Sequence, residues 1–162
     1  MSQTTRGPRG RVIFRYLASR FFMTQLNPYI RFDGKCREAM EFYRQCLGGD
    51  LTVITVSETP MAKQMPSEMQ QKVMHANLTN GKIVLLGSDM VGLEGFVNGN
   101  SFLLQLECDS ETQLRSLYSQ LTADSGKPLY PPSPSFWGGI YGQLVDKFGN
   151  SWILNYSANT QS

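Results

Sequence analysis

Few residues of this chain could do chemistry. His75 is the only histidine among 162 residues, and its imidazole could serve as a general base or as a pH-sensitive donor to an anionic ligand. Arg31 could hold a carboxylate or phosphate through its forked guanidinium. Each residue also has a structural interpretation, because His75 could be hydrogen-bonded inside a sheet and Arg31 could pair at the surface with an acid such as Glu58. At the level of sequence both interpretations stay open.

Aromatic residues and glycines come together in the segment 136–141, which reads Phe-Trp-Gly-Gly-Ile-Tyr. The two glycines would let the backbone pass close to a ligand, while Trp137 and Tyr141 form a wall beside it. The alternative is the start of a strand whose aromatic residues belong to the core.

Other familiar catalytic arrangements are missing from the sequence. No Ser-His-Asp set, phosphate-binding glycine loop or pair of carboxylates on one element can be placed, so hydrolase, kinase and glycosidase activities lack support. Asp146 and Gly149 are predicted to be turn residues without a chemical role.

Cysteine usage points to a reducing compartment. The chain has three cysteines and no CxxC pair, which is not the framework of a disulfide-stapled protein. Cys36, Cys46 and Cys108 fall on predicted helix stripes or strand ends, where packed and unreactive thiols are common. We therefore expect a cytoplasmic protein.

Composition predicts one globular domain in water. Of the residues, 41% are hydrophobic and 17% are charged, and no apolar run approaches the ~20 residues of a membrane-spanning helix. Five arginines precede Met23, and the remaining residues hold ten basic and thirteen acidic side chains, a net charge of −3. We expect no membrane partner and, without a basic stripe, no nucleic-acid partner.

The acid-free segment 1–22 is treated separately from the domain that we assign to residues 23–162. It could be a targeting helix or a surface-binding segment. The favoured interpretation is a basic extension that is mobile or lies upstream of a natural start at Met23.

The first half of the domain, about residues 27–89, reads β-α-β-β-β. Asp33 could cap its helix, and Asn80-Gly81 is a strong hairpin signal. The predicted elements are strand Asn27–Phe32, helix Lys35–Leu47, and strands Leu51–Ser57, Lys72–Thr79 and Lys82–Leu86, with a polar loop at Thr59–Gln70.

The second half, about residues 100–157, repeats this order. Ser110 and Gln113 can form a capping box, and the prolines after Lys127 restrict the sixth strand to a short or edge position. The predicted elements are strand Phe102–Cys108, helix Ser110–Ala123, a strand near Lys127–Tyr130, and strands Ile140–Val145 and Ser151–Tyr156. Placing Gly81 over Gly149 superimposes the two terminal hairpins and sets Gln143 opposite His75.

Three segments together resemble the vicinal oxygen chelate superfamily of glyoxalase I, bleomycin-resistance proteins and extradiol dioxygenases, most closely its PhnB-like branch. They read Asn27-Pro-Tyr-Ile-Arg-Phe, Cys36-Arg-Glu-Ala-Met-Glu-Phe-Tyr-Arg-Gln-Cys-Leu-Gly-Gly and Val145-Asp-Lys-Phe-Gly-Asn-Ser-Trp-Ile-Leu-Asn. The resemblance implies an α+β fold of two βαβββ modules whose sheets form an eight-stranded cup with the helices outside. It also implies a homodimer.

The metal chemistry usual in this superfamily is not supported by the matching residues. Its metalloenzymes carry His or Gln on the first strand, Glu on the fourth, His on the fifth and Glu on the eighth. Carried over, these positions fall near Asn27 or Pro28, Leu85, Ser101 and Ile153. A divalent metal prefers imidazole, carboxylate or thiolate ligands, so we expect no metal and no other cofactor, although a partner chain could contribute ligands.

Strand alternation predicts which side chains look into such a cup, because residues i and i+2 share a face. Ile30, Met74 and Leu104 suit the helix-covered face, which leaves polar residues on the opposite face. We expect one cavity lined by Tyr29, Arg31, His75, Asn77, Gln105, Trp137, Tyr141 and Gln143, which would bind a small polar or anionic organic molecule.

Two functional hypotheses follow. The first is a metal-independent small-molecule-binding protein of the bleomycin-resistance kind. The alternative is a lyase, isomerase or dioxygenase-type enzyme that uses an atypical metal site or His75 as a base. The lack of acidic and histidine ligands favours the first.

Overall fold

Two βαβββ modules follow one another in the chain. The computed structural model describes residues 24–158, and the extension inferred for residues 1–22 lies outside them. The eight strands form two four-stranded sheets, in the orders β1-β4-β3-β2 and β5-β8-β7-β6. In each sheet the first strand pairs in parallel with the last, and the other pairs are antiparallel. The predicted α+β fold of two modules is confirmed.

The first module keeps the predicted order with shorter ends. Its first strand has only three residues, and the hairpin turn is Gly81-Lys82, because Asn80 already pairs with Ile83. The elements are β1 Tyr29–Arg31, α1 Cys36–Leu47, β2 Asp50–Thr55, β3 Val73–Asn80 and β4 Ile83–Ser88. Residues 56–69, predicted mostly as loop, hold the 3₁₀ helices η1 Val56–Glu58, η2 Pro60–Gln64 and η3 Ser67–Met69.

The second module departs from prediction mainly at its sixth strand. That strand lies at the sheet edge, as its prolines require, but it runs for eight residues with irregular register instead of stopping near Tyr130. The elements are β5 Leu104–Glu107, α2 Glu111–Leu121, β6 Lys127–Pro134, β7 Ile140–Val145 and β8 Ser151–Tyr156. Ser110 caps α2 as predicted, by accepting a hydrogen bond from the Gln113 backbone N–H (3.1 Å).

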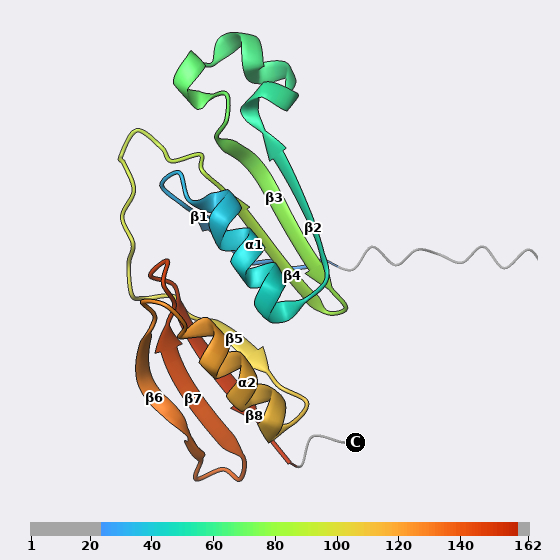
Figure 1. The fold of residues 1–162 in the computed structure, drawn as a ribbon, viewed down its shortest axis with the longest axis vertical. Coiled ribbons are helices and arrows are strands. Elements are labelled where there is room, and N and C mark those ends of the chain that lie inside the picture. Colours follow the sequence, from blue (N-terminus) through green and yellow to red (C-terminus); the bar gives the residue numbers. More distant parts are fainter. Residues whose placement is uncertain (1–23, 159–162) are drawn as a thin grey trace, which may run out of the picture.

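Both helices cover the same side of the two sheets and lie next to each other (Figure 1). Their apolar stripes are buried, with Ala39, Met40 and Leu114 fully inaccessible. Within residues 24–158, no α-helix covers the opposite faces of the sheets. None of the helices within residues 24–158 has the length and apolar character that a membrane crossing requires.

The start of α1 is fixed by a distant residue rather than by the predicted cap Asp33. Lys35 occupies the cap position without a side-chain hydrogen bond. The buried Asp89, at the end of β4, accepts from the backbone N–H of Cys36 (2.9 Å) and of Val73 (2.9 Å). A carboxylate at a helix N-terminus is favourable, so Asp89 ties the start of the helix to the sheet.

The internal repeat has a different register from the one predicted. Leu78 pairs with Leu85 in the first sheet, and Leu144 pairs with Trp152 in the second. Equating these pairs makes Gln143 the counterpart of Asn77, and Tyr141 the counterpart of His75. The Gly81-on-Gly149 superposition was wrong because the second turn, residues 146–150, is longer than the first.

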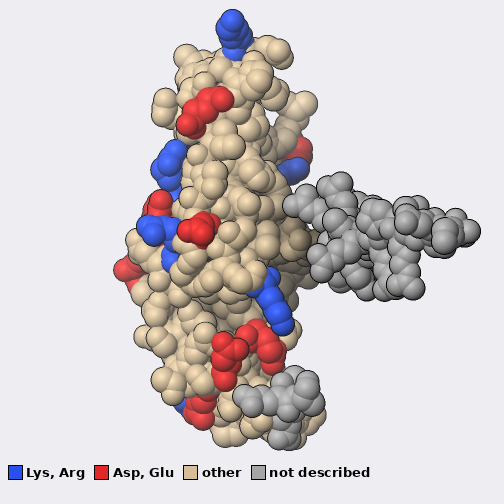
Figure 2. Space-filling view, turned by 90° about the vertical axis from the view of Figure 1, so that its right-hand side faces the viewer, with Lys and Arg blue, Asp and Glu red and all other residues tan. Residues whose placement is uncertain are grey.

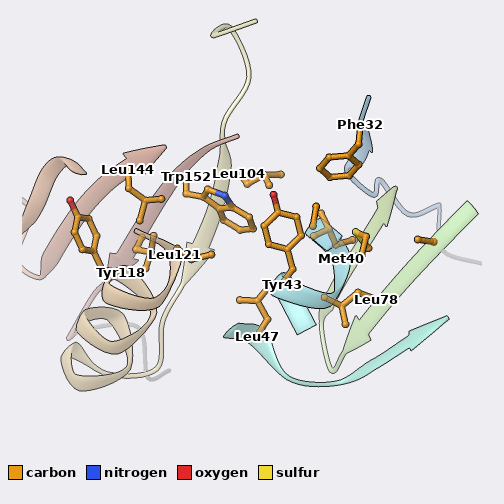
Figure 3. Packing of buried hydrophobic residues seen from close by; sticks show 14 of the residues in the cluster. Phe32, Met40, Tyr43, Leu47, Leu78, Leu104, Tyr118, Leu121, Leu144 and Trp152 are labelled. Atoms are coloured by element: carbon orange, nitrogen blue, oxygen red, sulfur yellow. The ribbon is translucent and has the colours of Figure 1, made fainter. Parts of the chain in front are cut away.

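The two modules share one hydrophobic core, and Tyr43 of α1 and Trp152 of β8 meet at its centre (Figure 3). Their ring centroids are 5.5 Å apart. Phe148, from the β7–β8 turn, packs edge-on against Tyr43 at 6.0 Å. These aromatic contacts join the first module to the second.

The carboxylate of Asp146 lies at the polar centre of this junction. Asp146 is 3% exposed and accepts hydrogen bonds from the Tyr43 hydroxyl (2.6 Å) and from Trp152 Nε1 (2.8 Å). The backbone N–H groups of Phe148 and Asn150 donate to its other oxygen. Burial, together with the Asp146 carboxylate, raises the pKa of the Tyr43 hydroxyl well above its usual value, which keeps it protonated as a donor.

We predict that Tyr43→Phe lowers the free energy of unfolding by about 1.5–3 kcal/mol, the cost of removing a hydrogen bond to a charged group. Urea denaturation followed by circular dichroism measures the change. Tyr156→Phe is the matched control, since Tyr156 packs against the same core, and it should change stability by less than about 0.5 kcal/mol. Equal stability of the two variants would contradict the role of the Tyr43 hydroxyl.

Candidate functional site

The side chains predicted to look into the cup come from the sheet faces opposite the helices. Ala76 and Leu78 are fully buried on the helix side of β3, so their neighbours His75 and Asn77 face the other way. Strand pairing extends this assignment to the other strands. The residues that share the helix-free faces include Tyr29, Arg31, His75, Asn77, Gln105, Tyr141 and Gln143.

His75 lies beside Tyr29 on the first sheet. The ring centroids are 5.9 Å apart with the planes tilted by 38°. Asn77, two residues further along β3, has a buried Oδ1 without a hydrogen-bond partner among the described residues. Unpaired buried oxygens are uncommon in proteins, and they are satisfied when a ligand or water supplies a donor.

Arg31 pairs with a residue other than the one considered from sequence. Its guanidinium lies 3.2 Å from Glu94 Oε1, and both side chains are largely exposed. Glu58 instead accepts from the backbone N–H and hydroxyl of Thr55, and these hydrogen bonds lower the pKa of its carboxyl. Beside Arg31 is a cavity of about 370 Å³, bounded by β1, the segment 91–102 and the β7–β8 turn.

A larger cavity of about 640 Å³ lies between the modules, lined by residues of β1 and β4 from the first sheet and of β5 and β8 from the second. Tyr29 and Gln105, which occupy equivalent positions in the two modules, both line it. The remainder of the wall is mostly apolar and includes Pro28, Ile83, Leu104 and Trp152. The polar side chains of Tyr29 and Gln105 therefore border an apolar cleft between modules.

Polar residues of the second sheet form a cluster that the predicted set covered only in part. Glu107 accepts from Asn155 Nδ2 (2.6 Å) and from Gln105 Nε2 (3.3 Å). The Tyr141 hydroxyl donates to Gln143 Oε1 (3.1 Å). Glu107 was not among the candidates, although alternation along β5 places it on the same face as Gln105. By the register of the repeat it is the acidic counterpart of Arg31.

Seven of the eight predicted residues share the helix-free sheet faces and Trp137 lies between β6 and β7, but a single chain does not gather all eight around one cavity. Trp137 and Tyr141 line a third cavity of about 360 Å³ beside β6, apart from the two at β1. His75, Asn77 and Gln143 border none of these three cavities.

The register also refines the positions at which the superfamily's metalloenzymes bind metal. Leu85 is 3% exposed and faces the helices, so Leu86 is the cup-side counterpart of Ile153. On β5 and its approach, the counterpart of Asn27 is Leu103 rather than Ser101. Leucine and isoleucine offer no donor atom. Within residues 24–158, no group of three or more His, Cys, Asp and Glu side chains is arranged to hold a metal ion.

The thiols are equally poor ligands and nucleophiles. Burial raises the pKa of Cys36 to about 12, with a further contribution from the Asp89 carboxylate. Burial is also the main cause that raises the pKa of Cys46 and of Cys108 to about 11. Because the thiolate is the reactive and metal-binding form, these cysteines act as packed side chains.

Comparison with known proteins identifies a family and a relative that match most of the chain. The model of the family described as Glyoxalase/Bleomycin resistance protein/Dioxygenase superfamily matches residues 25–154. Protein YjdN of Escherichia coli (strain K12) is 29% identical over 143 residues, which are 80% of this chain and 93% of that protein.

Solved structures show the same similarity. Protein PA1353 from Pseudomonas aeruginosa is 31% identical with a TM-score of 0.75, over 83% of this chain and 98% of that one. The PhnB protein from Bacillus cereus is 23% identical with a TM-score of 0.64, over 83% of this chain and all of that one. At that lower identity the likeness concerns the fold alone.

From the donor set we predict that protein purified without added metal holds no stoichiometric Zn, Ni, Mn or Fe. Elemental analysis by plasma mass spectrometry, with a metal-free buffer blank, measures the content. One equivalent of any of these metals that survives dialysis against a chelator would contradict the prediction.

Proposed function

The chain belongs to the glyoxalase/bleomycin resistance protein/dioxygenase superfamily, and from this membership we propose that it is a PhnB-like small-molecule-binding protein that works without a metal ion. The observation that carries the proposal is the character of the cup-side positions. Asn27, Leu86, Leu103 and Ile153 stand where the metalloenzymes have ligands. Polar and aromatic side chains suited to organic molecules surround them, next to open cavities.

The ligand we propose is a small polar or anionic molecule, with Arg31 as its anion partner. An exposed ion pair such as Arg31 with Glu94 contributes only about 0–1 kcal/mol. A carboxylate or phosphonate of a ligand can therefore replace Glu94 at little cost. Tyr29 and Phe102 supply aromatic walls of the same cavity, the usual combination in sites for small organic anions.

Base catalysis by His75 has less support than binding. A catalytic imidazole needs an acid or carbonyl that orients it. Its closest aromatic neighbour is Tyr29, and no acid in the described residues forms an ion pair with it. His75 is therefore proposed as part of the binding face.

The charge distribution supports small-molecule partners. On the face shown in Figure 2, basic and acidic side chains are interspersed, without an extended patch of one sign. This pattern is unlike the basic stripe that binds nucleic acids. The free cysteines Cys36, Cys46 and Cys108 support a reducing location, and we propose the cytoplasm.

A second copy of the chain is the partner we propose for the helix-free faces. Large hydrophobic side chains are exposed on that face of the first sheet, including Tyr29 at 50% and Ile54 at 38%. Exposed apolar groups of this kind commonly mark an interface. A homodimer would cover them and would bring cup residues of two chains together.

We predict that Arg31→Ala weakens binding of phenylphosphonate by about tenfold, or about 1.4 kcal/mol, because it removes a charged hydrogen bond at a partly exposed site. Isothermal calorimetry measures the affinity, with and without prior dialysis against EDTA. EDTA should make no difference.

The control for this variant is Arg44→Ala. Arg44 also pairs with an exposed carboxylate, Glu41 at 2.9 Å, but it lies on α1, away from the cup. It should bind phenylphosphonate like the unaltered protein. If Arg31→Ala binds as well as Arg44→Ala, or if EDTA abolishes binding, the proposed site is wrong.

We predict a dimer in solution at micromolar concentration. Sedimentation equilibrium should give about twice the 18.2 kDa mass of one chain. A single species of 18.2 kDa over the whole concentration range would contradict the dimer. The proposal that Arg31 binds an anion does not depend on this result.

A further inference from the structure

The edge of the second sheet carries aromatic rings around an open space. Tyr130 on β6, Tyr141 on β7 and Trp137 between these strands line a cavity of about 360 Å³. The Trp137 and Tyr141 rings are 5.8 Å apart and nearly perpendicular, at 84°. Tyr130 lies 6.5 Å from Tyr141, at 53°. We call this feature the aromatic hairpin, residues 130–141.

The backbone holds these rings in place. Gly138 and Gly139 both have positive φ, 85° and 154°, and the Ser135 backbone N–H donates to the Gly139 carbonyl (3.0 Å). A Cβ at Gly139 would collide with the carbonyl oxygen of Tyr156. This tight turn requires glycine, and it returns Trp137 toward Tyr141.

The chemistry of the lining favours a positively charged ligand. None of the residues around the cavity is charged. Its β6 wall contains Pro131 and Pro134, which have carbonyl acceptors but no N–H donors. The Ser135 Oγ is buried and has no hydrogen-bond partner among the described residues. The faces of aromatic rings carry negative potential, so the uncharged π faces of Tyr130, Trp137 and Tyr141 give this surface its electrostatic character.

The arrangement of the rings indicates the shape of that ligand. Because the Trp137 and Tyr141 rings are nearly perpendicular, a flat ligand ring can stack on only one of them. A nearly spherical methylated ammonium group contacts several ring faces at once, as in known aromatic cages. We propose that the aromatic hairpin binds a quaternary or methylated ammonium group of a small molecule.

This site is independent of the anion site proposed above. The residues that line this cavity and those that line the cavity beside Arg31 do not overlap. Binding of an ammonium group and binding of a phosphonate can therefore succeed or fail separately.

The test compares choline with 3,3-dimethylbutan-1-ol, which has the same shape but a carbon atom in place of the charged nitrogen. Calorimetry at constant ionic strength measures both affinities. We expect choline to bind at least tenfold more tightly than the alcohol. Equal affinities, or no choline binding, would overturn the proposal.

Variants locate the site. Trp137→Leu should weaken choline binding at least tenfold, and Tyr141→Phe, which keeps the ring, should leave it within about twofold. Leu129→Ala is the control, since Leu129 is an exposed apolar residue of β6 that does not line the cavity. Phenylphosphonate binding should be unaffected in all three variants.

Sedimentation of the same variants separates a ligand site from a subunit contact. If Trp137→Leu dissociates the protein into single chains while choline binding is unchanged, the aromatic hairpin is an interface and the proposal is wrong. Unchanged sedimentation with weakened choline binding is the expected result.

Discussion

The hydrogen bonds made by the buried carboxylate of Asp146 fix the position of the first module relative to the second. A buried carboxylate is costly unless donors surround it. The β7–β8 turn supplies two backbone N–H groups and Trp152 supplies a third donor, but the fourth comes from Tyr43 on the other module. The set is complete only when α1 is docked. The cleft between β1 and β5 therefore depends on a contact on the opposite side of the sheets.

This junction also gives a physical meaning to the segments that resemble the superfamily. Tyr43 of the Phe-Tyr pair in the first helix donates a hydrogen bond to Asp146 of the Asp-x-x-Gly-Asn-x-Trp sequence in the last hairpin, and it accepts one from Asn150 of the same sequence. Periodicity predicted the elements that carry them. The sequence assigned Asp146 only to a turn and named Asp33 as the helix cap without considering Asp89. The real partners are 103 and 53 residues apart, and no local pattern reports such contacts.

At the candidate site, too, the sequence predicted local features, whereas contacts between distant segments could not be predicted. Alternation placed Tyr29, His75 and Gln105 on the correct sheet faces, because side-chain direction in a strand is a local property. It did not show which of these residues share a cavity. That depends on how the sheet edges meet, and on the segment 91–102, which brings Glu94 to Arg31. The register of the repeat was misjudged because two turns of unequal length look alike in glycine content.

The prolines of β6 have a consequence for self-association. Four of its eight residues lack an N–H, so a foreign strand that adds along this edge finds few donors. The outer edge of the other sheet, β2, contains no proline. Endless sheet growth would require β2 of each copy to pair with β6 of the next, whereas pairing of β2 with β2 stops at two copies. The sheets are thereby protected against fibre formation through one strand alone.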